Sequence, residues 1–277
     1  MTGAKRFRRV ALTVLVLMGG MAMVTPFVWA ISTSLKARGA MMSYPPVLIP
    51  EEPTVAPYTE LLQRYPFARV FGNSVVVAVA TTLGQLVICS MAGYAFARFR
   101  FRGRNALFVL YLATLMVPFA VVITPLFIII KQLGWTDSYA GLIVPGMFSA
   151  FGTFFMRQFF QSVPRELEEA ATIDGAGTLL TFWRIVLPMT GPAIATLAVL
   201  SFMGSWNSFL LPMLIINDRH LMTLPVALAD LQGQYPGQMR LNVVMAGTVL
   251  STIPTILFFL LAQRWVIEGV AGSGVKG

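Results

Sequence analysis

Charged residues are scarce in this chain of 277 residues: 11% are Asp, Glu, Lys or Arg, whereas 57% are hydrophobic. A soluble domain carries about 25% charged residues. The composition therefore excludes an ordinary water-soluble enzyme and a disordered regulator, and it predicts a polytopic membrane protein. Because one helical span needs roughly 20 apolar residues, the chain is long enough for six spans and their loops.

Cysteine and histidine are scarcer still. Cys89 is the one cysteine, which excludes an intrachain disulfide and a cysteine metal cluster; its apolar surroundings predict a small packing residue. His220 is the one histidine, which excludes a His-based triad and a multi-His metal site, and we expect it to be solvated in a loop. We predict no cofactor and no metal, and since no span carries paired carboxylates we expect no enzyme.

Six apolar runs predict an all-α, polytopic helical bundle, with a single transmembrane domain over residues 1–277. The first run is longer than the roughly 7–15 apolar residues of a signal peptide, so we expect an uncleaved span rather than a leader. A proline-rich loop, 33–69, follows it and allows at most a short interfacial helix near Tyr58–Gln63. The predicted spans are about 10–31, 70–97, 106–130 (interrupted by Pro118 and Pro125), 139–160, 189–214 and 241–266.

The basic residues indicate the orientation of these spans. The net charge is +9, yet Lys and Arg cluster beside apolar runs, so we expect no nucleic acid partner. Most of them lie in the N-terminal tail, the 98–105 loop, the 157–188 segment and the C-terminal tail. The positive-inside rule then places both termini and the segment 161–188 in the cytoplasm, with the Arg98–Arg104 cluster as a topology and lipid-headgroup anchor.

No charged residue lies near the middle of a predicted span. Ion-coupled transporters usually keep an ionisable group there, so a self-sufficient secondary transporter, which would transport unaided in vesicles, is the weaker alternative. The chain also lacks a phosphate-binding loop of the G-x-x-x-x-G-K-[ST] type. If the protein moves a solute uphill, another chain must supply the energy.

The polar segment 161–188 predicts a helix–turn–helix. Pro164 suits the first helical position, and acidic residues follow within two turns. Gly175 accepts a left-handed cap conformation, so Asp174-Gly175 ends the first helix. We expect a second helix from about Thr178 to Val186, with Pro188 at its boundary with the fifth span.

One face of the first of these helices is suited to contact with another protein. Leu167, Ala170 and Ala171 lie at i, i+3 and i+4, and the small alanines allow close approach. Glu168 and Glu169 flank this face with charge. The alternative is a surface hairpin that touches only lipid headgroups, which the acidic residues disfavour beside anionic lipid.

Small polar residues in the fifth span are candidates for a solute path. Ser201, Ser205 and Ser208 recur at i, i+4 and i+7, a spacing that more often packs helices together in membranes. Asn207 has an amide that can reach a solute hydroxyl. Trp206 could stack on a sugar face, but an aromatic within a span lies more often in the core. Gln85, Tyr94 and Thr114 are weaker candidates. Pro118, Pro125 and Pro145 mark either rocking bends or ordinary kinks.

The chain matches every position of the pattern E-A-A-x3-G-x9-I-x-L-P. The matching residues are Glu169-Ala170-Ala171, Gly175 and, after nine intervening residues, Ile185-x-Leu187-Pro188. This segment resembles the EAA loop of binding-protein-dependent ABC importer permeases. Asp174-Gly175-Ala176 is similar to the carbohydrate-uptake branch, and more narrowly to the maltose-type second permease subunit, a group that includes glycerol-phosphate importers. The resemblance extends over the whole chain through Thr33–Lys36, Asn73-Ser74, Trp206-Asn207 and Gly274–Gly277.

The resemblance implies a bacterial inner-membrane permease subunit for a sugar or sugar-like solute, or for glycerol phosphate, with no enzymatic activity of its own. Its implied partners are a second homologous permease, a dimeric cytoplasmic ATPase and an extracytoplasmic solute-binding protein facing the loop 215–240. Glu169 would face a basic residue of the ATPase, and the tail Gly269–Gly277 would reach toward the ATPase dimer. Ser208 stands where many relatives carry an acidic residue. The implied ATPase-coupling residues are Glu168, Glu169, Ala170, Ala171, Asp174, Gly175, Leu187 and Pro188.

Overall fold

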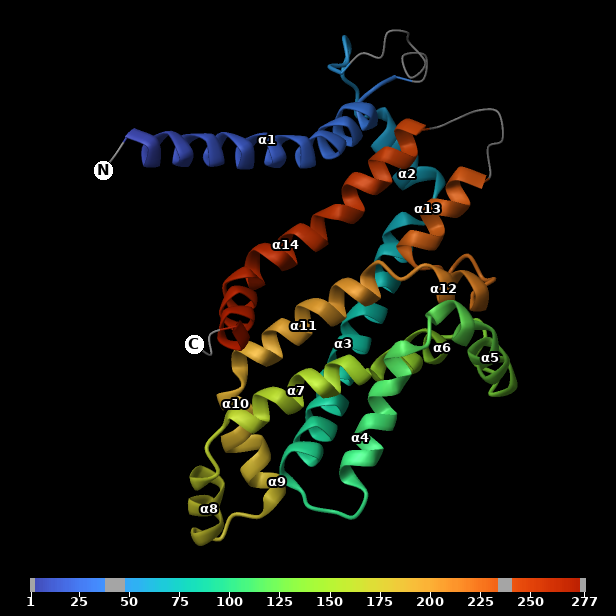
Figure 1. Ribbon diagram of the computed structural model, residues 1–277. Helices are drawn as coiled ribbons and strands as arrows, with labels where there is room; N and C mark the ends of the chain where they lie inside the picture. The colour runs from blue at the N-terminus through green and yellow to red at the C-terminus, as the bar shows by residue number, and fades with distance from the viewer. Residues whose placement is uncertain (1–2, 38–47, 234–240, 275–277) are drawn as a thin grey trace. The chain divides into compact units, whose positions relative to one another are not determined.

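A computed structural model describes residues 3–37, 48–233 and 241–274 of the chain, and within these ranges it holds helices and no strands (Figure 1). The predicted all-α class is therefore confirmed. Part of the loop 215–240, residues 234–240, and the last three residues of the tail Gly269–Gly277 lie outside the described residues.

Contacts between residues divide the chain into two compact units. The first unit comprises Met1–Ala68 and Leu228–Pro254, and the second comprises Arg69–Ala227 and Thr255–Gly277. The single transmembrane domain expected from the sequence stays a prediction.

Three helices are long and apolar enough to cross a membrane: α1 (Gly3–Ser34), α3 (Phe67–Arg98) and α14 (Leu241–Gly274). Each covers one predicted span and extends it by several residues. Three bent helix pairs bring the number of possible crossings among the described residues to six. The number of spans expected from the apolar runs is thereby confirmed.

The bent pairs differ from the continuous spans that the apolar runs suggested. In the third run, α4 (Arg104–Ala113) continues into η2 (Thr114–Met116) and meets α5 (Phe119–Gln132) at 103°. The break falls at Pro118, whose ring disfavours a helical residue before it, whereas Pro125 lies inside α5.

The fourth run is bent less. The helix α6 (Tyr139–Ile143) continues into η3 (Val144–Met147) and meets α7 (Ala150–Ser162) at 41°. Pro145 lies within η3, and the break follows at the N-cap Ser149 of α7. Apolarity alone gives no signal for such a change of direction.

The fifth span also has different boundaries from the predicted 189–214. Helix α11 runs from Gly191 to Trp206, and a short helix, α12 (Leu210–Ile215), follows a break. We expected the preceding helix to end at Pro188. It does not, because the π-helical turn η4 (Phe182–Val186) lets the chain continue through α10 (Leu187–Met189). A wider turn removes the clash between the proline ring and the carbonyl four residues earlier.

The first unit is held by polar contacts at the end of α1. The expected interfacial helix is present as α2 (Ala56–Arg64), and the hydroxyls of Ser34 and Tyr58 lie 2.8 Å apart. The amide of Asn242 donates to the carbonyl oxygen of Lys36 at 3.0 Å, which joins α14 to the residues after α1. The helix α13 (Leu224–Gly233) contributes Asp230, which accepts a hydrogen bond from Tyr65 at 3.2 Å.

The core of the second unit lies where α3 crosses α7. Gly93 permits the close approach: a methyl group there would lie 2.9 Å from the backbone nitrogen of Arg157. Cys89 is fully buried near Gly152 and Leu197, as a packing residue should be. Phe160 and Phe182 complete this cluster. The same packing fixes the end of α3 from which the candidate site is built.

Candidate functional site

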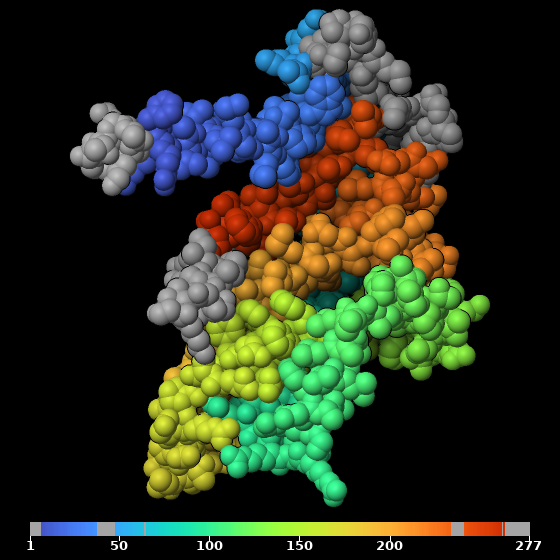
Figure 2. Space-filling view, viewed as in Figure 1, coloured from blue at the N-terminus to red at the C-terminus, as the bar shows by residue number. Residues whose placement is uncertain are grey.

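The segment 161–188 forms the expected helix–turn–helix, with α8 (Glu166–Ile173) followed by α9 (Thr178–Thr181) and η4. Figure 1 shows this hairpin at the same end of the second unit as the turn between α3 and α4, and Figure 2 shows it at the surface there. Pro164 lies two residues before the helix rather than at its first position, and Arg165 is the N-cap. We call the segment 166–186 the hairpin.

The turn of the hairpin has the geometry of a Schellman motif. Gly175 adopts a φ of +84°, the left-handed conformation predicted for it. Its N–H donates to the carbonyl of Thr172 at 3.0 Å, and the N–H of Ala176 donates to that of Ala171 at 2.9 Å. These two bonds satisfy carbonyls that the helix end would leave free, and glycine makes the conformation inexpensive.

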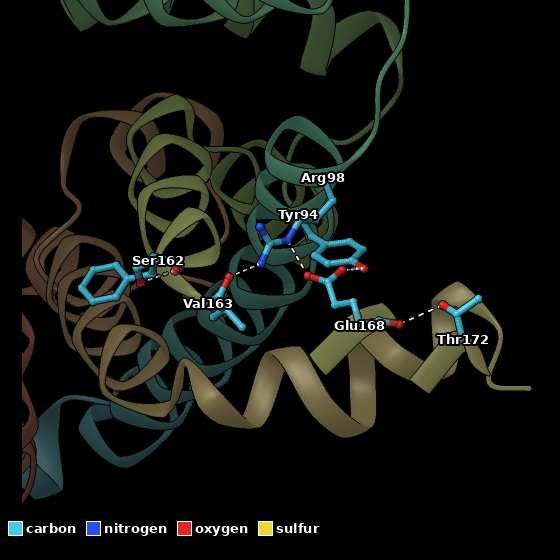
Figure 3. A network of polar contacts seen from close by, with 7 residues as sticks. Tyr94, Arg98, Ser162, Val163, Glu168 and Thr172 are labelled. Atoms are coloured by element: carbon cyan, nitrogen blue, oxygen red, sulfur yellow. Dashed lines mark hydrogen bonds and ion pairs between the residues drawn. The ribbon is translucent and has the colours of Figure 1, made fainter. Parts of the chain in front are cut away.

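Glu168 turns inward and joins the hairpin to the end of α3 (Figure 3). Its Oε1 lies 2.5 Å from Nε of Arg98, and its Oε2 accepts a hydrogen bond from the hydroxyl of Tyr94 at 2.8 Å. Arg98 also donates from Nη2 to the carbonyl of Val163 at 2.6 Å. The side chains of Arg98 and Glu168 are 7% and 17% exposed, so the ion pair is largely shielded from water, and solvent screens it less than a surface pair.

The neighbouring Glu169 is exposed, and so are the capping residue Asp174 and the proline Pro188. The predicted face of Leu167, Ala170 and Ala171 is divided: Ala171 is buried, whereas the other two are exposed. Leu187 is partly buried against the core. The hairpin also exposes apolar side chains, namely Leu167, Ile173, Leu179, Leu180 and Trp183. Acidic and apolar groups thus share the exposed surface of the hairpin.

A cavity of about 320 Å³ lies elsewhere in the second unit, between α3, α5, α7, α11 and α12. Three of the four predicted solute-path residues, Ser201, Ser205 and Ser208, line it. Asn207 does not: it is the C-cap of α11, and its amide donates to the carbonyl of Met203 at 2.8 Å. The remaining polar side chains of the wall are Thr81, Gln85, Ser149 and Thr223.

Two other candidates from the sequence lie away from this cavity. Thr114 donates its hydroxyl to the carbonyl of Tyr111 at 2.6 Å, and Tyr94 belongs to the Glu168 network. Trp206 is 3% exposed and packs against Phe71 and Phe202, so it is the core residue that we expected.

The far end of α3 holds a second polar cluster. The amide of Asn73 donates to the carbonyls of His220 and Met222, at 2.8 and 3.0 Å, and its oxygen accepts from the hydroxyl of Tyr139 at 2.7 Å. Ser74 accepts from the N–H of Leu224 at 2.7 Å. These bonds hold the residues after α12 against the start of α3. The side chain of His220 is exposed, as expected, with Nδ1 3.4 Å from Nη1 of Arg69.

A neighbouring loop residue, Asp137, fastens the same segment. It adopts a φ of +51°, and its Oδ1 accepts hydrogen bonds from the N–H groups of Asn217 and Asp218, at 2.5 and 2.9 Å. The bond from Asp218, followed by that from Asn217, lowers the pKa of the Asp137 carboxyl, because these donors favour its charged form.

Sequence reasoning overlooked the structural roles of several of these residues. Arg98 was expected only as a topology and headgroup anchor, whereas it is the partner of Glu168. A signal was available, because Tyr94 and Arg98 are four residues apart on one helix and so share a face. Thr81 and Thr223 gave no signal, since the chain brings them to one wall only through its tertiary packing.

The bent apolar helices, the hairpin and the partly polar cavity define a membrane transport protein. The chain belongs to the family of inner membrane components of binding-protein-dependent transport systems, whose model matches residues 85–272.

Individual relatives agree with this family. The chain is 34% identical over 246 residues to the arabinooligosaccharides transport system permease protein AraQ of Halalkalibacterium halodurans, covering 89% of this chain and 86% of that protein. It is 41% identical over 208 residues to the sn-glycerol-3-phosphate transport system permease protein UgpE of Yersinia enterocolitica, covering 75% of this chain and 74% of that protein.

A solved structure has the same fold. It is the crystal structure of a bacterial ABC transporter involved in the import of the acidic polysaccharide alginate. The TM-score is 0.86 at 23% identity, over 95% of this chain and 98% of that one. The resemblance stated from the sequence is confirmed: this chain is a permease subunit of a binding-protein-dependent transport system.

Proposed function

We propose that this subunit and a second homologous permease together form the path by which a sugar or sugar-like solute enters a bacterial cell. A cytoplasmic ATPase dimer would drive the cycle, and an extracytoplasmic solute-binding protein would deliver the solute. The chain itself would catalyse no reaction. The observation that carries the proposal is the hairpin, which is anchored through Glu168 and leaves Glu169 exposed beside apolar side chains.

The chemistry of the hairpin favours a protein partner over lipid. Its acidic residues Glu166, Glu169 and Asp174 are exposed, and anionic headgroups would repel them. Exposed leucines and a tryptophan beside them suit the apolar wall of a cleft, and a basic residue in that cleft would pair with Glu169. We therefore expect the hairpin to insert into a cleft of the ATPase.

The anchor of the hairpin explains how force would reach the membrane. A docked helix moves the spans only if it is joined firmly to them, and Glu168 joins α8 to α3 through Arg98. A continuous helix of 32 residues then leads away from this joint. Closure of the ATPase dimer would thus swing α3 together with α8, and differential contact in the two states would shift the equilibrium between inward-facing and outward-facing forms.

The two ends of α3 support an orientation in the membrane. The hairpin lies beside the turn that carries Arg98, Arg100, Arg102 and Arg104 (Figure 1), and such a cluster favours the cytoplasmic side. Asn73 lies 25 residues earlier on the same helix, about 37 Å away at a rise of 1.5 Å per residue. The residues 217–224 would therefore face the solute-binding protein, and both termini would be cytoplasmic.

The relatives favour two classes of solute. AraQ is named for arabinooligosaccharides and UgpE for sn-glycerol 3-phosphate. We propose a sugar as the first candidate and glycerol phosphate as the second, because the chain is more than 30% identical to a relative of each kind.

A charge reversal tests the docking of the hairpin. In Glu169→Lys we expect uptake and co-purification of the ATPase to fall at least tenfold, because a repulsive contact of roughly 1.4 kcal/mol or more replaces an attractive one. Glu52→Lys is the control, since Glu52 is also exposed but lies in the loop after α1. Unchanged uptake and ATPase association in Glu169→Lys would refute the proposed docking.

A further inference from the structure

The turn between α3 and α4 carries positive charge that the described part of the chain does not neutralise. Arg98 is paired with Glu168, but the next three arginines, Arg100, Arg102 and Arg104, form no ion pair with any described residue. Arg100 and Arg102 are exposed, and Arg104 is half-buried. The turn therefore has cationic groups available to an anion from outside the chain.

Arg157 on α7 adds a further charge beside this turn. Its guanidinium carbon lies 4.2 Å from the centre of the Phe108 ring, and its Nε donates to the carbonyl of Phe96 at 3.3 Å. Because Phe96 lies on α3 and Phe108 on α4, Arg157 contacts both helices that the turn joins. Among the described residues it also has no acidic partner. Several uncompensated charges in one region make the local potential positive.

Two of the three arginines share a hollow of about 350 Å³, which we call the basic hollow. Its lining residues are Arg100, Phe101, Gly103, Arg104, Asn105 and Ala106. Arg104 is held in place there, because its Nη1 donates to the carbonyl of Phe99 at 3.2 Å and its Nε to Oδ1 of Asn105 at 3.3 Å. These bonds leave Nη2 of Arg104 and the whole guanidinium of Arg100 for a ligand. Arginine N–H groups match the geometry of phosphate oxygens well.

The surroundings of the basic hollow suit a membrane surface. The turn directly follows Arg98, the last residue of a helix long and apolar enough to cross a membrane. Exposed Phe99 and Phe101 alternate with the arginines of the turn. Aromatic and basic side chains gather in this way at the level of the lipid headgroups.

An apolar helix face continues from the basic hollow. Ala106 lines the hollow, and Val109 and Leu110, three and four residues further along α4, share its face. They are 66% and 68% exposed, and α4 belongs to one of the bent pairs that can cross a membrane. An anion that carries acyl chains therefore fits this surface better than a free anion does.

We propose that the basic hollow binds the phosphate of an anionic phospholipid through Arg100 and Arg104, while an acyl chain of this lipid lies along Ala106, Val109 and Leu110. The sequence predicted only a general headgroup anchor, whereas the structure singles out two arginines and one helix face. The nearby hairpin exposes carboxylates that repel such a lipid, so the two surfaces select different partners. The site needs neither a solute nor an ATPase, and it goes beyond the proposed function.

Native mass spectrometry of the full-length chain in detergent tests this site. Dioleoyl phosphatidylglycerol supplies an anionic headgroup, and dioleoyl phosphatidylcholine supplies a zwitterionic one on the same acyl chains. We expect the first phosphatidylglycerol to bind at least about tenfold more tightly than phosphatidylcholine, since one arginine near an anionic headgroup contributes roughly fivefold. Inorganic phosphate at the same concentration should not displace the lipid, because it lacks the acyl chains.

Arg102 provides a matched control within the same turn. In Arg100→Gln and in Arg104→Gln we expect the affinity for phosphatidylglycerol to fall about fivefold, with the affinity for phosphatidylcholine unchanged. Arg102→Gln removes the same charge from an exposed residue outside the lining of the hollow, and the affinity should fall less than about twofold. Arg100 makes no hydrogen bond to a described residue, so its variant keeps the comparison valid if Arg104→Gln is unstable.

Photolabelling in nanodiscs locates the acyl chain. A phosphatidylglycerol with a photoreactive group on one acyl chain should label the peptide that contains Val109 and Leu110, and Arg100→Gln should reduce this labelling. Arg102→Gln should leave it close to that of the native chain.

Four results would overturn the proposal. The two lipids bind equally; Arg102→Gln loses as much affinity as Arg100→Gln, which would indicate only diffuse attraction; inorganic phosphate displaces the lipid, which would indicate a site for a free anion; or Arg100→Gln loses a protein partner but no lipid. The proposed function is judged separately by Glu169→Lys, which should bind phosphatidylglycerol normally. If that variant loses uptake while the native chain binds both lipids equally, the lipid site fails and the role of the hairpin stands.

Discussion

The end of α3 at Arg98 and the middle of α3 use polar groups in opposite ways. At the Arg98 end, Tyr94, Arg98 and Glu168 bind one another, and the bonds join two elements 70 residues apart in the chain. In the middle, the hydroxyl of Thr81 is buried and has no hydrogen-bond partner, and Thr81 is one of the residues that line the cavity. A paired buried group positions a neighbouring element, whereas an unpaired one lowers stability because its lost hydration is not replaced.

The largest expected effect comes from breaking the ion pair between Arg98 and Glu168. Arg98→Ala leaves Glu168 shielded from water without its partner, which should destabilise the protein by about 3 kcal/mol, and uptake should be lost. The measurements are thermal unfolding and uptake in the assembled transporter. Arg100→Ala, at an exposed arginine two residues away, should stay within about 0.5 kcal/mol of the native protein.

The exchanged pair sharpens this test. Arg98→Glu combined with Glu168→Arg restores opposite charges, so part of the lost stability and of the coupling between ATP hydrolysis and uptake should return. A double variant as defective as both single variants together would show that the two side chains act independently, contrary to the account.

A smaller effect is expected at the turn of the hairpin. Gly175→Ala places a side chain at a φ of +84°, which costs about 1–2 kcal/mol, whereas Gly175→Pro also removes the N–H bonded to Thr172 and should abolish uptake. Gly177→Ala is the matched control: both glycines have open space beside them, but Gly177 has a φ of −72°. Equal melting temperatures for the two alanine variants would contradict the role of the left-handed conformation.

The smallest effect concerns the loop that Asp137 fastens and its pH dependence. Because the folded-state pKa of Asp137 lies below its ordinary value of 3.8, its bonds to Asn217 and Asp218 stabilise the loop above that pH and are lost as the pH falls through the lowered pKa. Hydrogen exchange should therefore show the amides of Asn217 and Asp218 losing protection in acid. Asp137→Asn should remove this acid-dependent step; if the step persists, another group holds the loop.

Much of this architecture could be predicted because it depends on local chemistry. Apolar runs gave the six possible crossings, and Asp174-Gly175 gave the turn, since few residues other than glycine accept a positive φ at little cost. Cys89 and Trp206 were correctly expected in the core.

The failures concern direction and partnership over long distances. Adjacent residues on a helix point about 100° apart, so one of Glu168 and Glu169 could face inward, but only the position of Arg98 decides which. Pro188 was expected to end a helix, and the π-helical turn before it could not be foreseen from propensity. The place of Asn207 in the solute path stays a prediction; in this structure its amide donates to the end of its own helix, a local bond that such side chains often make.

Site-specific crosslinking tests the central claim most directly. In a Cys89→Ser chain assembled with its partners, a cysteine introduced in place of Glu169 should crosslink to the ATPase, and a cysteine introduced in place of Asn217 should not. An impermeant maleimide applied to intact cells should label only the cysteine at position 217. If the cysteine at position 169 reacts from outside the cell and never crosslinks to the ATPase, the hairpin is not the element on which the motor acts.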